Sequence, residues 1–293
     1  MVVSLFPVGV DSVELAKSKT SRIKMSNLPL YLVTFLAYSV LAVYFLRAQA
    51  SGNGDVLSRG PIGHAVLLPL VLHGYLLHET LFMAGEMNLG LVYVLSLILW
   101  LTMLVYWVAR FFYPIASLQT LVLPLAAVGS VLPALFPAVH TLSNTSFAFD
   151  AHIMAAMLVY SLFTIAALHA GLMSLVEKRL HHATLPRVLQ ALPPLLTMEK
   201  LLFRIIGAGF ILLTLTLLSG VVFSVQVFGK PWQLNHKFVF GLISWSVFAA
   251  LLMGHHFYGW RGRKAVHWMM SGYIFLLLAY LGTKFVLEVL LHR

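Results

Sequence analysis

Eight apolar stretches, each about long enough to cross a lipid bilayer, dominate this chain of 293 residues. A helix needs about 20 mainly apolar residues to span the hydrocarbon core, and a helix satisfies its own backbone hydrogen bonds where no water can. We therefore expect an all-α fold, a polytopic membrane protein with about eight transmembrane helices in one bundle. The stretches cover residues 28–46, 61–78, 91–109, 114–136, 151–176, 201–228, 237–258 and 266–291.

The fourth stretch is the least regular, because it contains Pro114, Pro124 and Pro133. Proline removes a backbone donor and disturbs the preceding helical turn. The stretch is expected to bend or break, or to enter and leave the membrane on one side. Seven spans are therefore the alternative to eight.

Composition agrees with a membrane protein and excludes several soluble classes. Hydrophobic residues make up 60% of the chain and charged residues 10%, and mean hydropathy is +0.93. Soluble domains carry roughly 45–50% apolar and about 25% charged residues, so a soluble enzyme and a disordered chain are both excluded. The chain has no cysteine, which excludes a disulfide framework, an iron–sulfur cluster and a thiol nucleophile.

The net charge of +10 reflects membrane topology. The loops after the first, third, fifth and seventh stretches hold 11 Lys and Arg residues, against two in the loops after the second, fourth and sixth. The positive-inside rule places the basic loops in the cytoplasm and both termini outside, although the basic cluster at 17–24 opposes this. No basic stripe alternates with aromatic residues, so the expected partner is the lipid bilayer and not nucleic acid.

The domain organisation is simple, because no low-complexity linker divides the chain. Residues 1–27 form an N-terminal lead that we expect to be amphipathic or disordered, and residues 28–293 one integral membrane domain. Within that domain, segment 181–200 is apolar on one face but broken by prolines, so we expect it to lie in the membrane interface.

Histidine is the only plentiful metal-ligand side chain, with 13 copies. An ionisable residue inside a membrane helix is costly and marks a functional candidate, and burial favours the neutral, ligating imidazole. The histidines fall near two levels, one in each leaflet. The outer group is His140, His152, His236 and His292, His73 lies at middle-to-outer depth, and the cytoplasmic group is His64, His255 and His256.

Neutral imidazole suits haem iron, copper or zinc. Few carboxylates and no cysteine are available to complete a zinc site, whereas two imidazoles from different helices suffice for haem. A dihaem cytochrome b is disfavoured, because no stretch carries two deep histidines. The remaining histidines have ordinary explanations: interfacial solvation for His181, His182 and His267, an interface marker for His78 beside Glu79, and a neighbouring carbonyl or serine for His169.

Four segments resemble one known family. They read LPPLLTMEKLLFRIIGAGFILLTLTLLSGVVF at 192–223, LNHKFVFGLISWSVFAALLMGHHFYGWRGRKAV at 234–266, SGYIFLLLAYLGTKF at 271–285 and FDAHIMAAMLVYSLFTIAALHAGLM at 149–173. The most specific piece is GHHFYGWRGR at 254–263. Together the four segments resemble the cytochrome c assembly family, which includes CcsA, CcmC and HemX, and within it most the branch of YpjD and HemX. The resemblance extends over roughly residues 30–290.

The resemblance implies haem as cofactor and a role for five histidines. His152 matches a histidine that binds haem at the outer surface, His255 matches one of a haem site within the membrane, and both would be axial iron ligands. His292 loosely matches the partner of the outer haem, and His73 and His140 match positions of the YpjD-like branch.

The expected pairs are His255 with His73 or His64, and His152 with His292 or His140. Two cations of the turn after the seventh stretch, Arg261 and Arg263, could neutralise haem propionates.

One segment departs from the family pattern. CcsA and CcmC carry a Trp-rich segment, WGxxWxWDxKE, before the seventh helix, where this chain reads VFGKPWQLNHK at 227–237 and keeps only Trp232. The resemblance therefore does not carry over haem delivery to apocytochrome c, although His236 could be an added ligand.

The function expected is a haem-binding, haem-handling or haem-translocating protein of the bacterial inner membrane, related to cytochrome c biogenesis. Other cytochrome c assembly or haem-synthesis proteins are its implied partners. Two alternatives remain: a HemX-like regulatory or assembly factor without stable haem, and a small-molecule transporter in which the Pro-rich fourth stretch is a broken helix. No nucleophile, acid–base pair or phosphate loop is present in the sequence, so we do not expect an enzyme.

Overall fold

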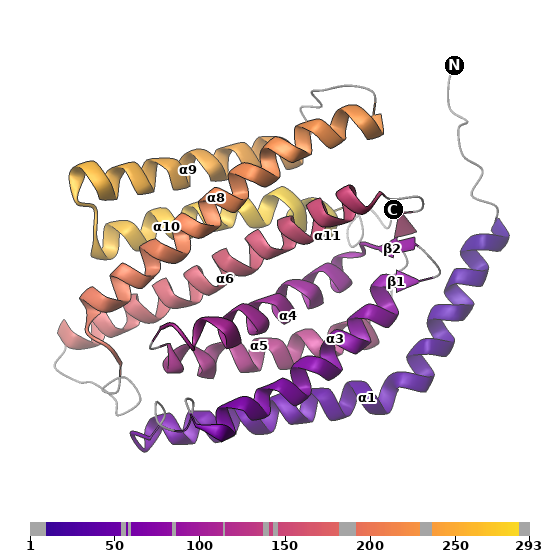
Figure 1. The fold of residues 1–293 in the computed structure, drawn as a ribbon, viewed down its shortest axis with the longest axis horizontal. Coiled ribbons are helices and arrows are strands. Elements are labelled where there is room, and N and C mark those ends of the chain that lie inside the picture. Colours follow the sequence, from indigo (N-terminus) through magenta and orange to yellow (C-terminus); the bar gives the residue numbers. More distant parts are fainter. Residues whose placement is uncertain are drawn as a thin grey trace.

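Eight helices in the described part of the chain are long and apolar enough to cross a membrane, and they form one elongated bundle (Figure 1). The expectation of an all-α polytopic fold with about eight spans is confirmed. The computed structural model describes residues 10–53, 57, 60–83, 86–113, 115–136, 141–142, 146–181, 192–228 and 236–286.

Consecutive spans run in opposite directions, as short connections between membrane helices require. The chain forms α1 (Val10–Ala50), the short 3-10 helix η1 (Pro61–Val66) leading into α3 (Leu67–Leu81), α4 (Leu91–Ala109), α5 (Ala116–Leu135), α6 (Phe147–His181), α8 (Leu195–Phe228), α9 (His236–Tyr258) and α10 (Gly262–Leu277), which continues through the π-helical turn η2 (Leu278–Gly282) into α11 (Thr283–Phe285).

The first helix is longer than the first apolar stretch. It begins at Val10, so residues 10–27 of the expected lead form its initial turns. Pro29 lies in its interior and α1 bends along its length (Figure 1), as proline inside a helix commonly causes. Half of the expected interfacial segment, residues 182–191, lies outside the described residues.

The Pro-rich helix α5 is continuous and crosses the bundle, so the seven-span alternative is wrong. A neighbouring helix supplies one donor that a proline removes. Pro133 has no N–H to bond the carbonyl of Gly129 four residues earlier, and Ser96 Oγ of α4 donates to that carbonyl at 2.7 Å instead. Such replacement from a neighbouring helix is how membrane helices tolerate proline.

A small antiparallel sheet, which the sequence did not predict, joins the loops that follow α3 and α5. Its strands are β1 (Phe82–Met83), β2 (Glu86–Asn88) and β3 (Thr141–Leu142), in the order β1-β2-β3. Met87 pairs with Leu142 and Asn88 with Thr141. These two loops therefore lie at one end of the bundle, as the topology from the basic residues requires.

The helices pack in two groups that α4 and α6 join. The N-terminal helix group is α1, α3, α4 and α5, and the C-terminal helix group is α6, α8, α9 and α10. The core of the second group contains Phe163 of α6 stacked on Phe248 of α9, with ring centroids 4.0 Å apart. Gly272 of α10 makes room for this pair, because a Cβ there would lie 2.8 Å from Phe248. Such close packing holds membrane helices together where the lipid offers no hydrophobic drive.

Candidate functional site

His152 lies in the second turn of α6, half-buried among aromatic rings. Its ring centroid is 6.4 Å from that of Phe149 and 5.3 Å from that of Phe223 on α8. The two phenylalanines touch each other edge to face at 5.7 Å. The imidazole therefore has an apolar aromatic environment between the ends of two helices.

The hydrogen bonds of His152 assign the proton on its ring. Nδ1 lies 2.8 Å from Ser219 Oγ, and that hydroxyl donates its single proton to the carbonyl of Thr216. With the hydroxyl proton on that carbonyl, 3.2 Å away, the serine oxygen accepts the Nδ1–H of His152. Nε2 is then left unprotonated. Gly220 lies beside it, since a Cβ there would be 4.0 Å from Nε2.

His255 lies in the last turn of α9 and its proton is assigned in the same way. Nδ1 is 3.0 Å from the carbonyl oxygen of Trp260, which can only accept. Nδ1 therefore carries the proton and Nε2 the lone pair. The ring stacks on Phe203 of α8, with centroids 3.5 Å apart and planes 15° from parallel.

The turn after α9 holds that carbonyl in place. The indole of Trp260 covers Gly254, where a Cβ would lie 2.3 Å from the ring. Arg261 follows, and its Nε lies 3.3 Å from Oε1 of Glu199 at the start of α8. Arg261, which we expected to meet haem propionates, is thus paired with a carboxylate, although its side chain is 64% exposed. Arg263 is exposed as well.

The two candidate ligands lie at opposite ends of the C-terminal helix group (Figure 1). His152 is near the end that carries the small sheet, and His255 is near the α9–α10 turn. One histidine at each end matches the two levels that the sequence predicts.

His73 belongs to the other helix group and is not brought to His255. It lies on α3, which packs against α1 and α4, on the side of the bundle away from α9 (Figure 1). It is 1% exposed, and its Nε2 is 3.0 Å from Ser96 Oγ. That hydroxyl donates to the carbonyl freed by Pro133, so Nε2–H of His73 donates to Ser96. The ring thereby supports the hydrogen bond by which Ser96 replaces the donor that Pro133 removes from α5.

Other candidate ligands stand as follows. His140 and His292 lie outside the described residues, and so does Trp232. His236 is exposed at the first residue of α9. His64 accepts a hydrogen bond at Nδ1 from Arg110 Nη2 at 3.0 Å, because a guanidinium can only donate.

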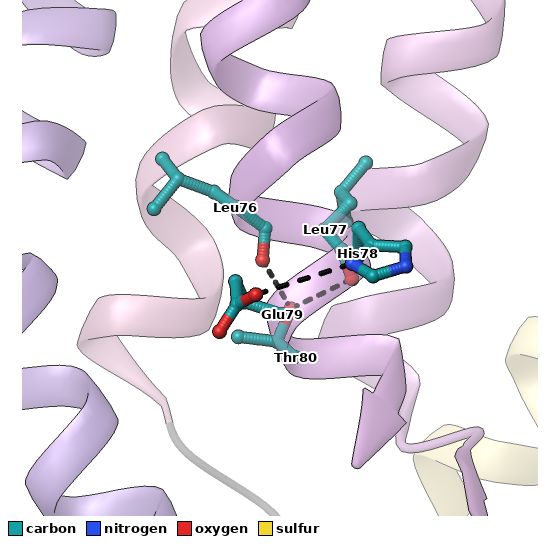
Figure 2. A network of polar contacts seen from close by, with 5 residues as sticks. All are labelled: Leu76, Leu77, His78, Glu79 and Thr80. Atoms are coloured by element: carbon teal, nitrogen blue, oxygen red, sulfur yellow. Dashed lines mark hydrogen bonds and ion pairs between the residues drawn. The ribbon is translucent and has the colours of Figure 1, made fainter. Parts of the chain in front are cut away.

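The ordinary interpretations of His169 and His78 agree with the structure, whereas His182 lies outside the described residues. His169 donates from Nε2 to the carbonyl of Met198 at 2.8 Å, as its position in the middle of a span suggested. Figure 2 shows His78 beside Glu79 at the end of α3, with 4.0 Å between Nδ1 and Oε1, while Thr80 bonds the carbonyls of the preceding turn. His78 is well exposed there.

Sequence reasoning missed the residues that orient the ligands. Ser219 is 67 residues from His152, and Phe203 comes from a helix other than that of His255. Glu199, Phe203 and Ser219 lie inside the segment 192–223 that resembles the family, and Trp260 lies inside 234–266. The resemblance pointed to these segments but assigned none of the four residues a role beside a histidine.

The two sites fit an iron porphyrin better than a bare metal ion. No group of three or more His, Cys, Asp or Glu side chains gathers in the described residues, and such a group is what zinc requires. Haem iron needs only one or two axial side chains. Each site offers one imidazole whose other N–H is held by the protein, beside aromatic rings that suit a porphyrin face.

Comparison with known proteins adds a family and several relatives. Residues 62–291 match the family described as Cytochrome C assembly protein. "Inner membrane protein YpjD" of Escherichia coli (strain K12) is 34% identical over 139 residues, which cover 47% of this chain and 52% of that protein.

Two relatives named "Cytochrome c biogenesis protein CcsA" also match. The protein of Rippkaea orientalis is 39% identical over 88 residues, covering 30% of this chain and 26% of its own length. The protein of Gloeothece citriformis is 38% identical over 88 residues, covering 30% and 27%. The matches thus span about half of the E. coli protein and about a quarter of these two proteins.

Proposed function

The chain belongs to the cytochrome c assembly protein family, and from this premise we propose that it binds haem in the bacterial inner membrane and takes part in cytochrome c biogenesis. Relatives named for the inner membrane and for cytochrome c biogenesis support this role. The proposed role is binding and transfer, without a catalytic step.

The observation that carries the proposal is that Nδ1 of both His152 and His255 lies within hydrogen-bond distance of a protein oxygen. Histidines that bind metals donate their second ring N–H to a protein acceptor, which fixes the ring and leaves the other nitrogen free. Both candidates do this, one to Ser219 Oγ and one to the Trp260 carbonyl. Both therefore present Nε2 as a neutral ligand.

When haem is bound, its iron supplies the acceptor for these lone pairs. The protein's part is to orient and to desolvate. Phe149 and Phe223 shield the ring of His152, and Phe203 covers one face of the His255 ring. Exposed Arg263 is the remaining candidate for a propionate at the basic end.

Two ligands at opposite ends of one helix group support haem handling across the membrane. The basic loops place His255 at the cytoplasmic end and His152 at the outer end. In the proposed role, haem is held at either end by one of these imidazoles, with the other protein groups keeping water away from the porphyrin.

Absorbance spectroscopy tests the proposal. The protein is expressed with added haem, purified in detergent, and compared with His152→Ala, His255→Ala and the double variant. We expect a Soret band that weakens in each single variant and disappears in the double variant. His256→Ala and His267→Ala are matched controls, because both rings lie exposed beside the proposed site.

A folded wild-type protein without a Soret band would overturn haem binding and favour the regulatory-factor or transporter alternatives. An undiminished band in the double variant would overturn the assignment of these two histidines.

A further inference from the structure

A continuous chain of contacts connects a carboxylate on α8 with the ring proton of His255. The Nδ1–H of His255 donates to the Trp260 carbonyl at 3.0 Å. The backbone N–H of Trp260 donates to the carbonyl of Gly254 at 3.1 Å. The next residue, Arg261, pairs with Glu199. The Trp260 carbonyl, which accepts the hydrogen bond of His255, therefore lies between two points at which the turn is held, the N–H of Trp260 and the side chain of Arg261.

Glu199 makes two bonds to this turn. Its Oε1 lies 3.3 Å from Arg261 Nε, and its Oε2 accepts the backbone N–H of Gly262 at 3.4 Å. Gly262 is the first residue of α10, where the helix dipole favours a negative charge. The Glu199 side chain is 13% exposed and that of Arg261 64% exposed, so the carboxylate is the buried partner and water reaches the ion pair from the side of the arginine.

The turn is also held by the indole of Trp260, which packs on Gly254 and has its ring centroid 5.0 Å from that of Trp268. Gly259 and Gly262 have φ values of 63° and 53°, a region in which glycine carries no steric penalty. These two residues flank Trp260 and Arg261. Flexible residues on both sides mean that side-chain contacts, and not backbone preference, decide where the Trp260 carbonyl points.

We propose that Glu199 is the positioning residue of the His255 site. It holds the turn so that the Trp260 carbonyl accepts a hydrogen bond from the Nδ1–H of His255, and Nε2 stays free for a ligand. This inference rests on the proposed haem site, but its first consequence concerns the apo protein. Phe203, four residues along α8 from Glu199, stacks on the same imidazole. Helix α8 thus sets both the plane of the His255 ring and which of its two nitrogens carries the proton.

The tautomer of His255 is the direct readout. Protein labelled with ¹⁵N-histidine, without haem, is compared with Glu199→Ala and Glu199→Gln by NMR, with His255→Gln providing the assignment. We expect a single Nδ1–H form in the wild type and a mixture with Nε2–H in Glu199→Ala. Glu199→Gln keeps an acceptor for Gly262 but loses the charge, so its change should be smaller.

Haem retention is the second readout. We expect the haem dissociation constant of Glu199→Ala to rise about 10-fold, since groups that orient a metal-binding histidine have effects of 10- to 100-fold. Lys200→Gln is the matched control, because it removes a charge from the neighbouring, exposed position of α8. It should leave both the tautomer and haem retention unchanged.

The outcomes separate this inference from the proposed function. An unchanged His255 tautomer in Glu199→Ala overturns the positioning role, whether or not the protein binds haem. A changed tautomer in a protein that never binds haem supports the positioning role and overturns the haem proposal. A loss of folding in Glu199→Ala leaves the test to Glu199→Gln, whose tautomer shift or lack of one decides.

Discussion

A histidine binds iron only through a nitrogen that carries no proton, so the acceptor of its other N–H decides its role. His152 and His255 both donate from Nδ1. His73 and His169 instead donate from Nε2, and their buried Nδ1 atoms find no partner within the described ranges. His152 and His255 thus share a feature that is lacking in His169 and in His73, which was also a predicted ligand.

Ser219 is expected to matter for the His152 site although it would touch no ligand. In Ser219→Ala the Nδ1–H of His152 loses its acceptor, so the ring is no longer held in one orientation. We expect haem at the outer site to be retained about 10-fold less tightly, as measured by haem titration in a His255→Ala background.

Ser246→Ala provides the comparison, since Ser246 bonds only within its own helix and should not alter the titration. Equal titration curves for Ser219→Ala and its parent would show that the serine does not orient His152.

At the scale of the helix, glycine at position 254 is required by the indole that lies against it. In Gly254→Ala the new Cβ would be 2.3 Å from Trp260, so the ring must move and carry the Trp260 carbonyl with it. We expect unfolding in detergent to show a loss of about 1–3 kcal/mol, together with reduced haem retention at the His255 site.

The matched change is Gly207→Ala in α8, where a Cβ meets nothing within 4 Å. Alanine favours a helix interior by about 1 kcal/mol over glycine, so this variant should be no less stable than the wild type. A Gly254→Ala protein as stable as Gly207→Ala would contradict the close packing of the turn.

The hydrogen bond from Ser96 to the Gly129 carbonyl of α5 gives a second prediction at the scale of the helix. Ser96→Ala leaves the Gly129 carbonyl and the His73 N–H without partners, and should cost about 1–3 kcal/mol of unfolding free energy. Pro133→Ala restores a backbone N–H to that carbonyl, so the double variant should recover part of the loss. Chemical denaturation of the variants measures these free energies of unfolding. If the changes from Ser96→Ala and Pro133→Ala simply add in the double variant, Ser96 does not replace the donor that Pro133 removes.

The spans could be predicted from the sequence because an apolar run of helix length has one stable structure in lipid. The continuity of α5 could not, since it depends on Ser96, which lies 33 residues from the carbonyl that it bonds. The strands could not either, because strands of two or three residues have no periodicity. Likewise, the sequence predicted His152 and His255 as ligands but not the distant side chains that hold them.

For the whole molecule, the orientation in the membrane decides which of the two proposed histidine sites faces the cytoplasm. The chain has no cysteine, so single cysteines can report orientation directly. Phe147→Cys and Lys178→Cys place exposed thiols near the two ends of α6. In intact spheroplasts, a membrane-impermeant maleimide should label the first and not the second.

Labelling of Lys178→Cys but not Phe147→Cys would reverse the orientation and with it the assignment of His255 to the cytoplasmic end. Detergent-opened cells are the control, because both thiols should then react.

The pairing of β2 with β3 has a consequence for how the protein is made. A ribosome delivers β2 soon after α3, but β3 emerges only when α4 and α5 have been synthesised. Strands β2 and β3 can therefore pair only after the hairpin of α4 and α5 has been inserted. Their pairing then joins the loops on either side of that hairpin. In order of synthesis, the sheet is therefore complete only after α5 and just before α6, the helix that carries His152.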